Sequence, residues 1–205
     1  LLEVSPYRRS TAGTGPEAHT MQMASVLARL QPTPQATAPV PHRGRASPYS
    51  GRIVITVTVE DPRQPEVEAL LRAGDAYALS LYPADSCYML NLDELVEPGV
   101  TVFVARDAQA RALGMAALVN RGDTTGELKR LYVDEAGRGQ GVATAVMDAL
   151  EAAARAQGIR TLQLETGPKQ LAAIALYERR GYRHIENFGP YVGDEFSVCM
   201  ETTLV

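Results

Sequence analysis

Several residue types are scarce in this chain of 205 residues, and each scarcity excludes a class of protein. Only two cysteines (Cys87 and Cys199) and three histidines occur, which is too few for a disulfide framework or a zinc site. The sequence therefore predicts no bound metal, and the low cysteine content is typical of a reducing, cytoplasmic compartment. No apolar run approaches the ~18 residues that a membrane span needs, and no basic region followed by an apolar one marks a secretory signal. We therefore expect no membrane partner.

An excess of positive charge is also absent. The chain has 20 Lys and Arg against 24 Asp and Glu, a formal net charge of −4, so no overall basic field predicts a nucleic-acid partner. Any phosphate binding must therefore be local. Hydrophobic residues make up 45% of the chain, which is ample for one buried core. This composition is typical of a globular enzyme or binding domain.

Two parts of the chain differ in composition, with the boundary near residue 51. Seven of the thirteen prolines lie in 1–50 among many Ala, Ser and Thr residues, which predicts a disordered tail at 1–50 and a folded domain at 51–205. Residues 18–59 contain arginine and no acidic residue, a pattern that an organellar transit peptide also shows. A third alternative is an over-extended start upstream of Met21 or Met23.

Residue periodicity in 51–205 predicts alternating strands and helices. Runs of β-branched or alternating apolar residues predict strands, and apolar residues at three- and four-residue steps predict amphipathic helices. The expected strands are 53–59, 100–105, 112–119, 127–133, 161–165 and 196–200, and the expected helices are 67–81, 92–95, 141–157 and 171–180. The fold class is therefore α/β, with a mixed, mostly antiparallel central sheet flanked by helices and one β-α-β crossover. In the last strand, Phe196, Val198 and Met200 are expected to alternate with Ser197 and Cys199.

A glycine-rich turn at 134–141 connects the strand that ends at Val133 to the following helix. Amides at a helix N-terminus have no acceptor within the helix and lie at the positive end of its dipole, so a glycine turn there can admit a phosphate. A plain connector explains the turn equally well. Spacing excludes two other phosphate motifs: no Lys follows a glycine as in a P-loop, and the last position of a dinucleotide fingerprint falls on Val142 or Thr144.

Three sequence blocks, in this order along the chain, resemble the GNAT superfamily of N-acetyltransferases. Residues 127–134 are similar to the fourth strand of that family, 138–143 fit its motif Arg-x-x-Gly-x-Ala, and 173–182 are similar to its helix ending in Ala-Leu-Tyr-Glu-Arg-x-Gly-Tyr. The resemblance covers most of 51–205. It implies a GNAT-like fold with acetyl-CoA as co-substrate, and it places the cofactor turn in the β-α-β crossover.

The resemblance also implies a set of cofactor contacts. Strand amides would pair with the pantetheine arm and polarise the thioester carbonyl, and the turn would hold the pyrophosphate. The residues expected to bind acetyl-CoA are Leu131, Tyr132, Val133, Arg138, Gly139, Gln140, Gly141, Val142, Ala143 and Gln170. Gln170 stands where many members carry Asn, and its side chain is one methylene longer.

Amine acetylation needs an unprotonated amine, a stabilised oxyanion and a proton for the leaving thiolate. Tyr177 matches the family tyrosine near the cofactor sulfur, so the resemblance implies that it is the general acid. Glu127 and Glu165 are both candidates for the general base, because both can face the gap between two splayed strands. Lys129 shares a strand face with Glu127.

Substrate contacts are expected from Tyr82, Arg130 and Tyr191. Arg130 and its neighbour Lys129 could bind the carboxylate of an amino-acid-like acceptor, and structural ion pairing explains both residues equally well. We expect a small-molecule amine, since no acidic run suits a polyamine and no peptide groove is evident. Two alternatives to this function stay open: acetylation of a protein or peptide amine, and a noncatalytic domain that binds acetyl-CoA. A homodimer is also possible.

Overall fold

The structure is a computed structural model that describes residues 53–205. The predictions of a disordered tail, a transit peptide or a later start fall on residues outside this range. No helix among the described residues is long and apolar enough to cross a membrane.

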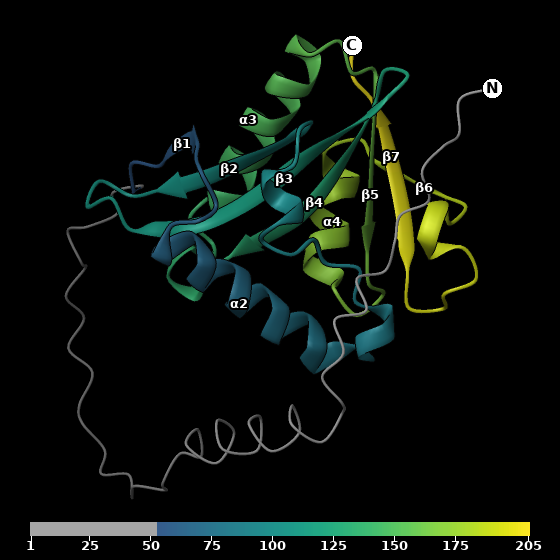
Figure 1. The fold of residues 1–205 in the computed structure, drawn as a ribbon, viewed down its shortest axis with the longest axis horizontal. Coiled ribbons are helices and arrows are strands. Elements are labelled where there is room, and N and C mark those ends of the chain that lie inside the picture. The colour runs from purple at the N-terminus through teal and green to yellow at the C-terminus, as the bar shows by residue number, and fades with distance from the viewer. Residues whose placement is uncertain (1–52) are drawn as a thin grey trace, which may run out of the picture. The chain divides into compact units, whose positions relative to one another are not determined.

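A seven-stranded sheet forms the centre of the fold (Figure 1), and its strands are ordered β1-β2-β3-β4-β5-β7-β6. The strands are β1 Thr56–Val59, β2 Val100–Arg106, β3 Ala112–Gly122, β4 Thr125–Val133, β5 Thr161–Thr166, β6 Arg183–Ile185 and β7 Val198–Thr203. Neighbouring strands are antiparallel except for β4 and β5, which run parallel. The predicted mixed, mostly antiparallel sheet is therefore confirmed.

The first four strands form an antiparallel meander. Gly122 pairs with Thr125 across the hairpin that joins β3 to β4. Asp123 and Thr124 between them both have positive φ, 47° and 61°, as a two-residue hairpin turn that matches the twist of its strands requires. A tight turn therefore joins β3 to β4, and β4 begins two residues earlier than predicted.

Helices cover both faces of the sheet (Figure 1): α2 lies on one face, and α3 and α4 lie on the other. Their bounds are α2 Pro65–Leu81, α3 Val142–Ala156 and α4 Leu171–Arg179. Helix α2 has Pro65 and two acidic residues in its first turn, where proline's fixed φ and negative charge both favour a helix start. Each face has its own apolar core, one centred on the buried side of α3 and the other on α2. The predicted layered α/β architecture is confirmed.

The connection β4-α3-β5 is the predicted β-α-β crossover. The parallel pairing covers only Thr125–Leu128 of β4 and Thr161–Leu164 of β5. Beyond Leu128 the two strands have no paired residues, while β5 continues against β7 as far as Thr166. A gap therefore opens in the sheet at the carboxyl ends of β4 and β5.

Some predicted elements differ from the observed ones. Strand β6 was not predicted, because three residues are too short to show a period. Strand β7 starts at Val198 rather than at 196. Its neighbouring residues Cys199 and Met200 are both buried, and so is Ser197 just before the strand, whereas Phe196 and Val198 are only half-buried, so the expected alternation is absent. The short helix predicted at 92–95 is a 3₁₀ turn. The 3₁₀ turns are η1 Ala84–Ser86, η2 Glu94–Val96, η3 Glu135–Gly137 and η4 Gly189–Tyr191.

Candidate active site

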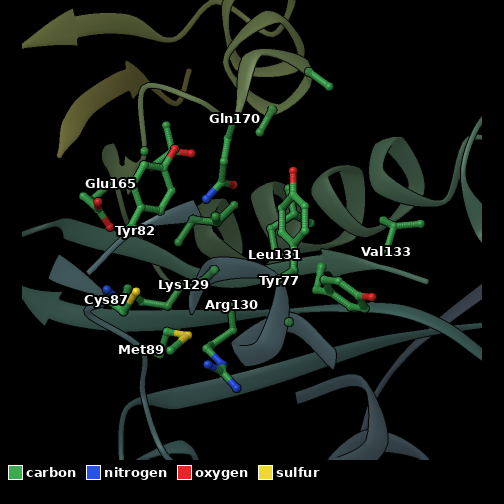
Figure 2. A pocket seen from close by; sticks show the side chains of 18 of the residues that line it. Tyr77, Tyr82, Cys87, Met89, Lys129, Arg130, Leu131, Val133, Glu165 and Gln170 are labelled. Carbon is green, nitrogen blue, oxygen red and sulfur yellow. The ribbon is translucent and has the colours of Figure 1, made fainter. Parts of the chain in front are cut away.

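A cavity of about 540 Å³ lies where β4 separates from β5. Helix α2, the loop after it, strands β4 and β5 and helix α4 all contribute to its walls. Figure 2 looks into this cavity, with Glu165, Tyr82 and Cys87 toward one end and Val133 toward the other. Its size and mixed polar and apolar walls are typical of a small-molecule site.

A bulge in β4 shapes one wall of the cavity. The register between β3 and β4 shifts between the pairs Met115–Tyr132 and Ala117–Lys129, so β4 has one extra residue there. Arg130, inside this bulge, has a φ of 60°, a left-handed conformation that L-residues adopt only when their surroundings impose it. The bulge bends β4 away from β5. As a result Leu131, Tyr132 and Val133, all expected to bind the cofactor, line the cavity.

The glycine turn at the start of α3 offers free amides. The first bond of the helix runs from the Ala145 amide to the Gly141 carbonyl, so the amides of Val142, Ala143 and Thr144 have no acceptor within the helix. Gly139 and Gly141 have φ of 72° and 88°, and a Cβ placed on either would meet no atom within 4 Å. Space in front of the turn is therefore open, as a bound anion would need.

The remaining turn residues differ in what they can contribute. Arg138 and Ala143 line the cavity, and the Arg138 guanidinium lies 6.0 Å from the centre of the Tyr77 ring. The Gln140 side chain donates instead to the Ala136 carbonyl, 2.7 Å away. Val142 turns its side chain into the core against Gly114, so only its backbone amide is available to a ligand.

Tyr177 and Glu165 are both part of the cavity wall. Burial raises the pKa of Tyr177, and the nearby Glu165 charge raises it further, which puts the two groups within electrostatic range of each other. Burial also raises the pKa of Glu165, while Lys129 and a hydrogen bond from Ser197 oppose that shift. The Ser197 hydroxyl donates to Glu165 Oε1 over 3.1 Å, and Glu165 Oε2 has no hydrogen bond to any described residue.

Glu127, the other candidate for the general base, lies outside the cavity lining. It is 2% exposed, and its Oε2 accepts from the Arg121 guanidinium, with Nε 2.8 Å away. Its Oε1 accepts a 2.6 Å hydrogen bond from the Tyr191 hydroxyl. Its partner strand residues are Val119 and Gln163, so it sits where the sheet is still paired and not at the gap.

Lys129 connects this buried group to the cavity. Its Nζ donates to the Tyr191 hydroxyl at 2.8 Å and lies 3.8 Å from Glu127 Oε1, which confirms that Lys129 and Glu127 share a strand face. Burial lowers the pKa of Lys129, against the opposing charges of Glu127 and Glu165. Lys129 lines the cavity, whereas Tyr191, a predicted substrate contact, is 1% exposed and does not.

The other two predicted substrate residues line the cavity but already have protein partners. The Arg130 guanidinium pairs with Asp75 of α2 and donates to the Leu71 carbonyl. Tyr82 packs its ring against Gly167, where a Cβ would lie 2.2 Å from the ring, and its hydroxyl accepts from the Lys169 amide over 2.7 Å. Gln170, the substituted cofactor residue, also lines the cavity, and Figure 2 shows it directed into the opening.

Several cavity residues were not predicted from the sequence. Asp75, which holds Arg130, lies on the same stretch of α2 as the wall residues Gly74, Tyr77 and Ala78. The three- and four-residue spacing of these α2 positions was the sequence signal that could have placed them on one face of the helix. Thr166 at the end of β5 lines the cavity, and its Oγ1 is the only buried side-chain N or O atom among residues 53–205 without a hydrogen-bond partner. No sequence pattern marks such an atom.

Comparison with known proteins agrees with this geometry. The family model of the acetyltransferase (GNAT) family matches residues 67–182, which span β4, the glycine turn, α3 and α4. The chain is 36% identical over 151 residues to an IAA acetyltransferase of Azospirillum brasilense, a match that covers 73% of this chain and 98% of the relative. The chain therefore belongs to the GNAT acetyltransferase family.

Two solved structures have the same fold. A Klebsiella pneumoniae protein classed as an acyl-CoA N-acyltransferase is 38% identical, with a TM-score of 0.63 over 74% of this chain and 98% of that one. An aminoglycoside 6′-N-acetyltransferase in complex with coenzyme A is 20% identical, with a TM-score of 0.54 over 73% of this chain and 97% of that one. At that identity the second likeness shows the fold alone. Membership of the family supports an acyltransferase activity.

Proposed function

We propose that this protein transfers an acetyl group from acetyl-CoA to a primary amine of a small molecule, by direct attack of the amine within a ternary complex. The observation that carries the proposal is the gap between β4 and β5. It joins the wall formed by Leu131–Val133 to Glu165 and Tyr177 in one cavity, next to the open glycine turn of α3. A binding surface for a thioester and two groups capable of proton chemistry therefore meet in one place.

The binding half of the proposal rests on the backbone. Beyond Leu128, β4 has no paired residue on its β5 side, so those amides of Leu131–Val133 that point to that side can serve a ligand in the gap. The free amides of Val142 and Ala143, with the helix dipole behind them, suit a pyrophosphate. Arg138 adds a cation at the same end of the cavity. Acetyl-CoA, once bound, supplies the acetyl thioester.

For the general base we propose Glu165 rather than Glu127. Glu165 faces the cavity with one oxygen that has no hydrogen bond to residues 53–205, whereas both oxygens of Glu127 are already bonded, to Arg121 and Tyr191. Burial raises the pKa of Glu165, which moves a carboxylate toward the range in which it can accept a proton from an ammonium group. Glu165 would thus deprotonate the incoming amine, directly or through water.

For Tyr177 the raised pKa refines the expected role. The phenol stays protonated at neutral pH, so a donor is always present. A raised pKa also makes the phenol a weaker acid than an ordinary tyrosine, and a thiol has a lower pKa than a phenol from the outset. We therefore propose that Tyr177 donates a hydrogen bond to the leaving sulfur, and that the sulfur's proton comes finally from the acetylated nitrogen.

The proposal is tested by mixing the purified chain with acetyl-CoA and a panel of primary amines, peptides and proteins. Thiol release reports turnover for any acceptor, and mass spectrometry identifies which component gains the acetyl group. Acetylation of small amines above the rate of hydrolysis supports the proposal. Acetylation confined to peptides or proteins contradicts the small-molecule assignment, and tight binding of acetyl-CoA with no thiol release contradicts catalysis.

A further inference from the structure

We propose that the acceptor is a primary amine with an aromatic or apolar body and without a carboxylate on the carbon that bears the amine. This inference rests on the proposed function, because it concerns the acceptor end of the same cavity. It excludes α-amino acids as good substrates. It replaces the expectation that Arg130 and Lys129 bind the carboxylate of an amino-acid-like acceptor.

Arg130 cannot serve an acceptor carboxylate, because its guanidinium is already neutralised. Its Nη1 pairs with Asp75, its Nη2 donates to the Leu71 carbonyl over 3.3 Å, and its side chain is only 7% exposed. Both contacts come from α2, which packs across the end of the bulge. A substrate carboxylate would have to displace Asp75 from a guanidinium group that is itself almost fully buried.

Lys129 is occupied in a similar way. Its ammonium donates to the Tyr191 hydroxyl and lies beside Glu127, and its side chain is 6% exposed. Lys169 is further out: its ammonium donates to the Leu81 carbonyl at 2.8 Å and is exposed. A carboxylate several bonds from the amine could still reach Lys169, so only a carboxylate next to the amine is excluded.

Glu165 is the one carboxylate among the described residues that line the cavity. An amine placed to be deprotonated by Glu165 brings its adjacent carbon close to the same carboxylate. A second negative charge on that carbon would face Glu165 with little water between them. An amine without that charge does not meet this repulsion from Glu165.

The walls near Glu165 present rings and sulfur atoms. Tyr82, Cys87, Tyr88, Met89 and Phe196 all line the cavity. The hydroxyl of Tyr82 accepts from the Lys169 amide, and that of Tyr88 donates to Asp194 over 2.9 Å. With these hydroxyls held by the protein, the rings are what an acceptor would contact, and they suit an aromatic or apolar body.

The experiment compares amines in matched pairs that differ only in the carboxylate: tyramine with tyrosine, phenethylamine with phenylalanine, and tryptamine with tryptophan. We expect kcat/KM to be at least ~10-fold higher for the amine in a majority of pairs, as a like-charge penalty of ~1.4 kcal/mol or more requires. In Asp75→Asn the Arg130 guanidinium loses its partner, so the amine to amino acid ratio is expected to fall severalfold.

Asp148→Asn is the matched control, because Asp148 is also a helical aspartate paired with an arginine, Arg180, outside the cavity. It should leave the ratio unchanged. Equal or better turnover of the amino acids by the natural chain, or an unchanged ratio in Asp75→Asn, would overturn the inference and leave the proposed function standing. Acetylation of no primary amine at all would overturn the proposed function and the inference with it.

Discussion

Replacement of Gly141 by aspartate tests the binding half of the site most directly. Gly141 is the residue that caps α3, its φ is 88°, and the space in front of it is open. An aspartate there would put a carboxylate beside the free amides of Val142 and Ala143, where we propose that the pyrophosphate of acetyl-CoA binds. The carboxylate would both occupy that space and repel the phosphates.

The size of the effect follows from charge and distance. Two unit charges 4 Å apart repel by ~4 kcal/mol at an effective dielectric of ~20, and by ~1 kcal/mol in bulk water. These limits correspond to increases in Kd of about 1000-fold and about 5-fold. The turn is exposed but next to a cavity, so we expect an increase of ~10-fold to ~1000-fold, measured by calorimetric titration with acetyl-CoA.

Gly158→Asp is the matched control for backbone strain. Gly158 ends α3, has a φ of 76°, and also has open space where a Cβ would lie. Both variants therefore meet the left-handed penalty of ~1–2 kcal/mol. The helix dipole disfavours aspartate at the C-terminal end, so the control should lose at least as much folding stability as Gly141→Asp. If the two variants bind acetyl-CoA equally well, the pyrophosphate assignment is refuted.

Four further substitutions separate catalysis from folding. Tyr177→Phe should lower kcat ~10-fold to ~100-fold with little change in the KM for acetyl-CoA, and equal kcat would remove Tyr177 from the mechanism. Glu165→Gln should lower kcat/KM for the amine and abolish the rise of activity with pH through the raised pKa of Glu165; a retained rise would point to another base. Glu127→Gln should lower the free energy of unfolding by ~3 kcal/mol, measured by denaturant unfolding, because it leaves Arg121 and Lys129 without their buried partner. An unchanged free energy of unfolding would contradict the buried network. Thr166→Val should stabilise the free protein by ~1–2 kcal/mol, because Oγ1 is buried without a partner; a loss of stability would show that the hydroxyl is bonded.

The parts of the fold that were predictable are those specified by local sequence. The strand, glycine turn and helix from 127 to 156 follow one another without a break, and each has its own periodicity and turn chemistry. The hairpin at Asp123 and Thr124 is equally local. Strand β6 was missed because a strand of three residues has no period. The first residue of β7 was missed because burial on both faces removes the alternation of that strand.

The same distinction between local and distant residues applies to the candidate site. Positions within a motif, such as Leu131–Val133 and Tyr177, could be placed in the cavity from the resemblance. The choice between Glu127 and Glu165 could not be made, because it depends on Tyr191, which lies 64 positions from Glu127 and bonds to it. The same holds for Asp75 and Arg130, which are 55 positions apart and paired. A sequence shows which side chains can ionise, and only the fold shows which of them already have a partner.

The bulge at Arg130 links the two halves of the proposed reaction. An ordinary strand would continue to pair with β5 past Leu128 and would close the gap, so the extra residue is what exposes the edge of Leu131–Val133. The left-handed backbone of Arg130 has a cost in free energy, and the pairing of its guanidinium with Asp75 helps to offset it. That pairing also engages one of the cations that line the cavity. The contact that stabilises the opening for the thioester is thus the one that, in our inference, leaves Glu165 to select an amine without a neighbouring carboxylate.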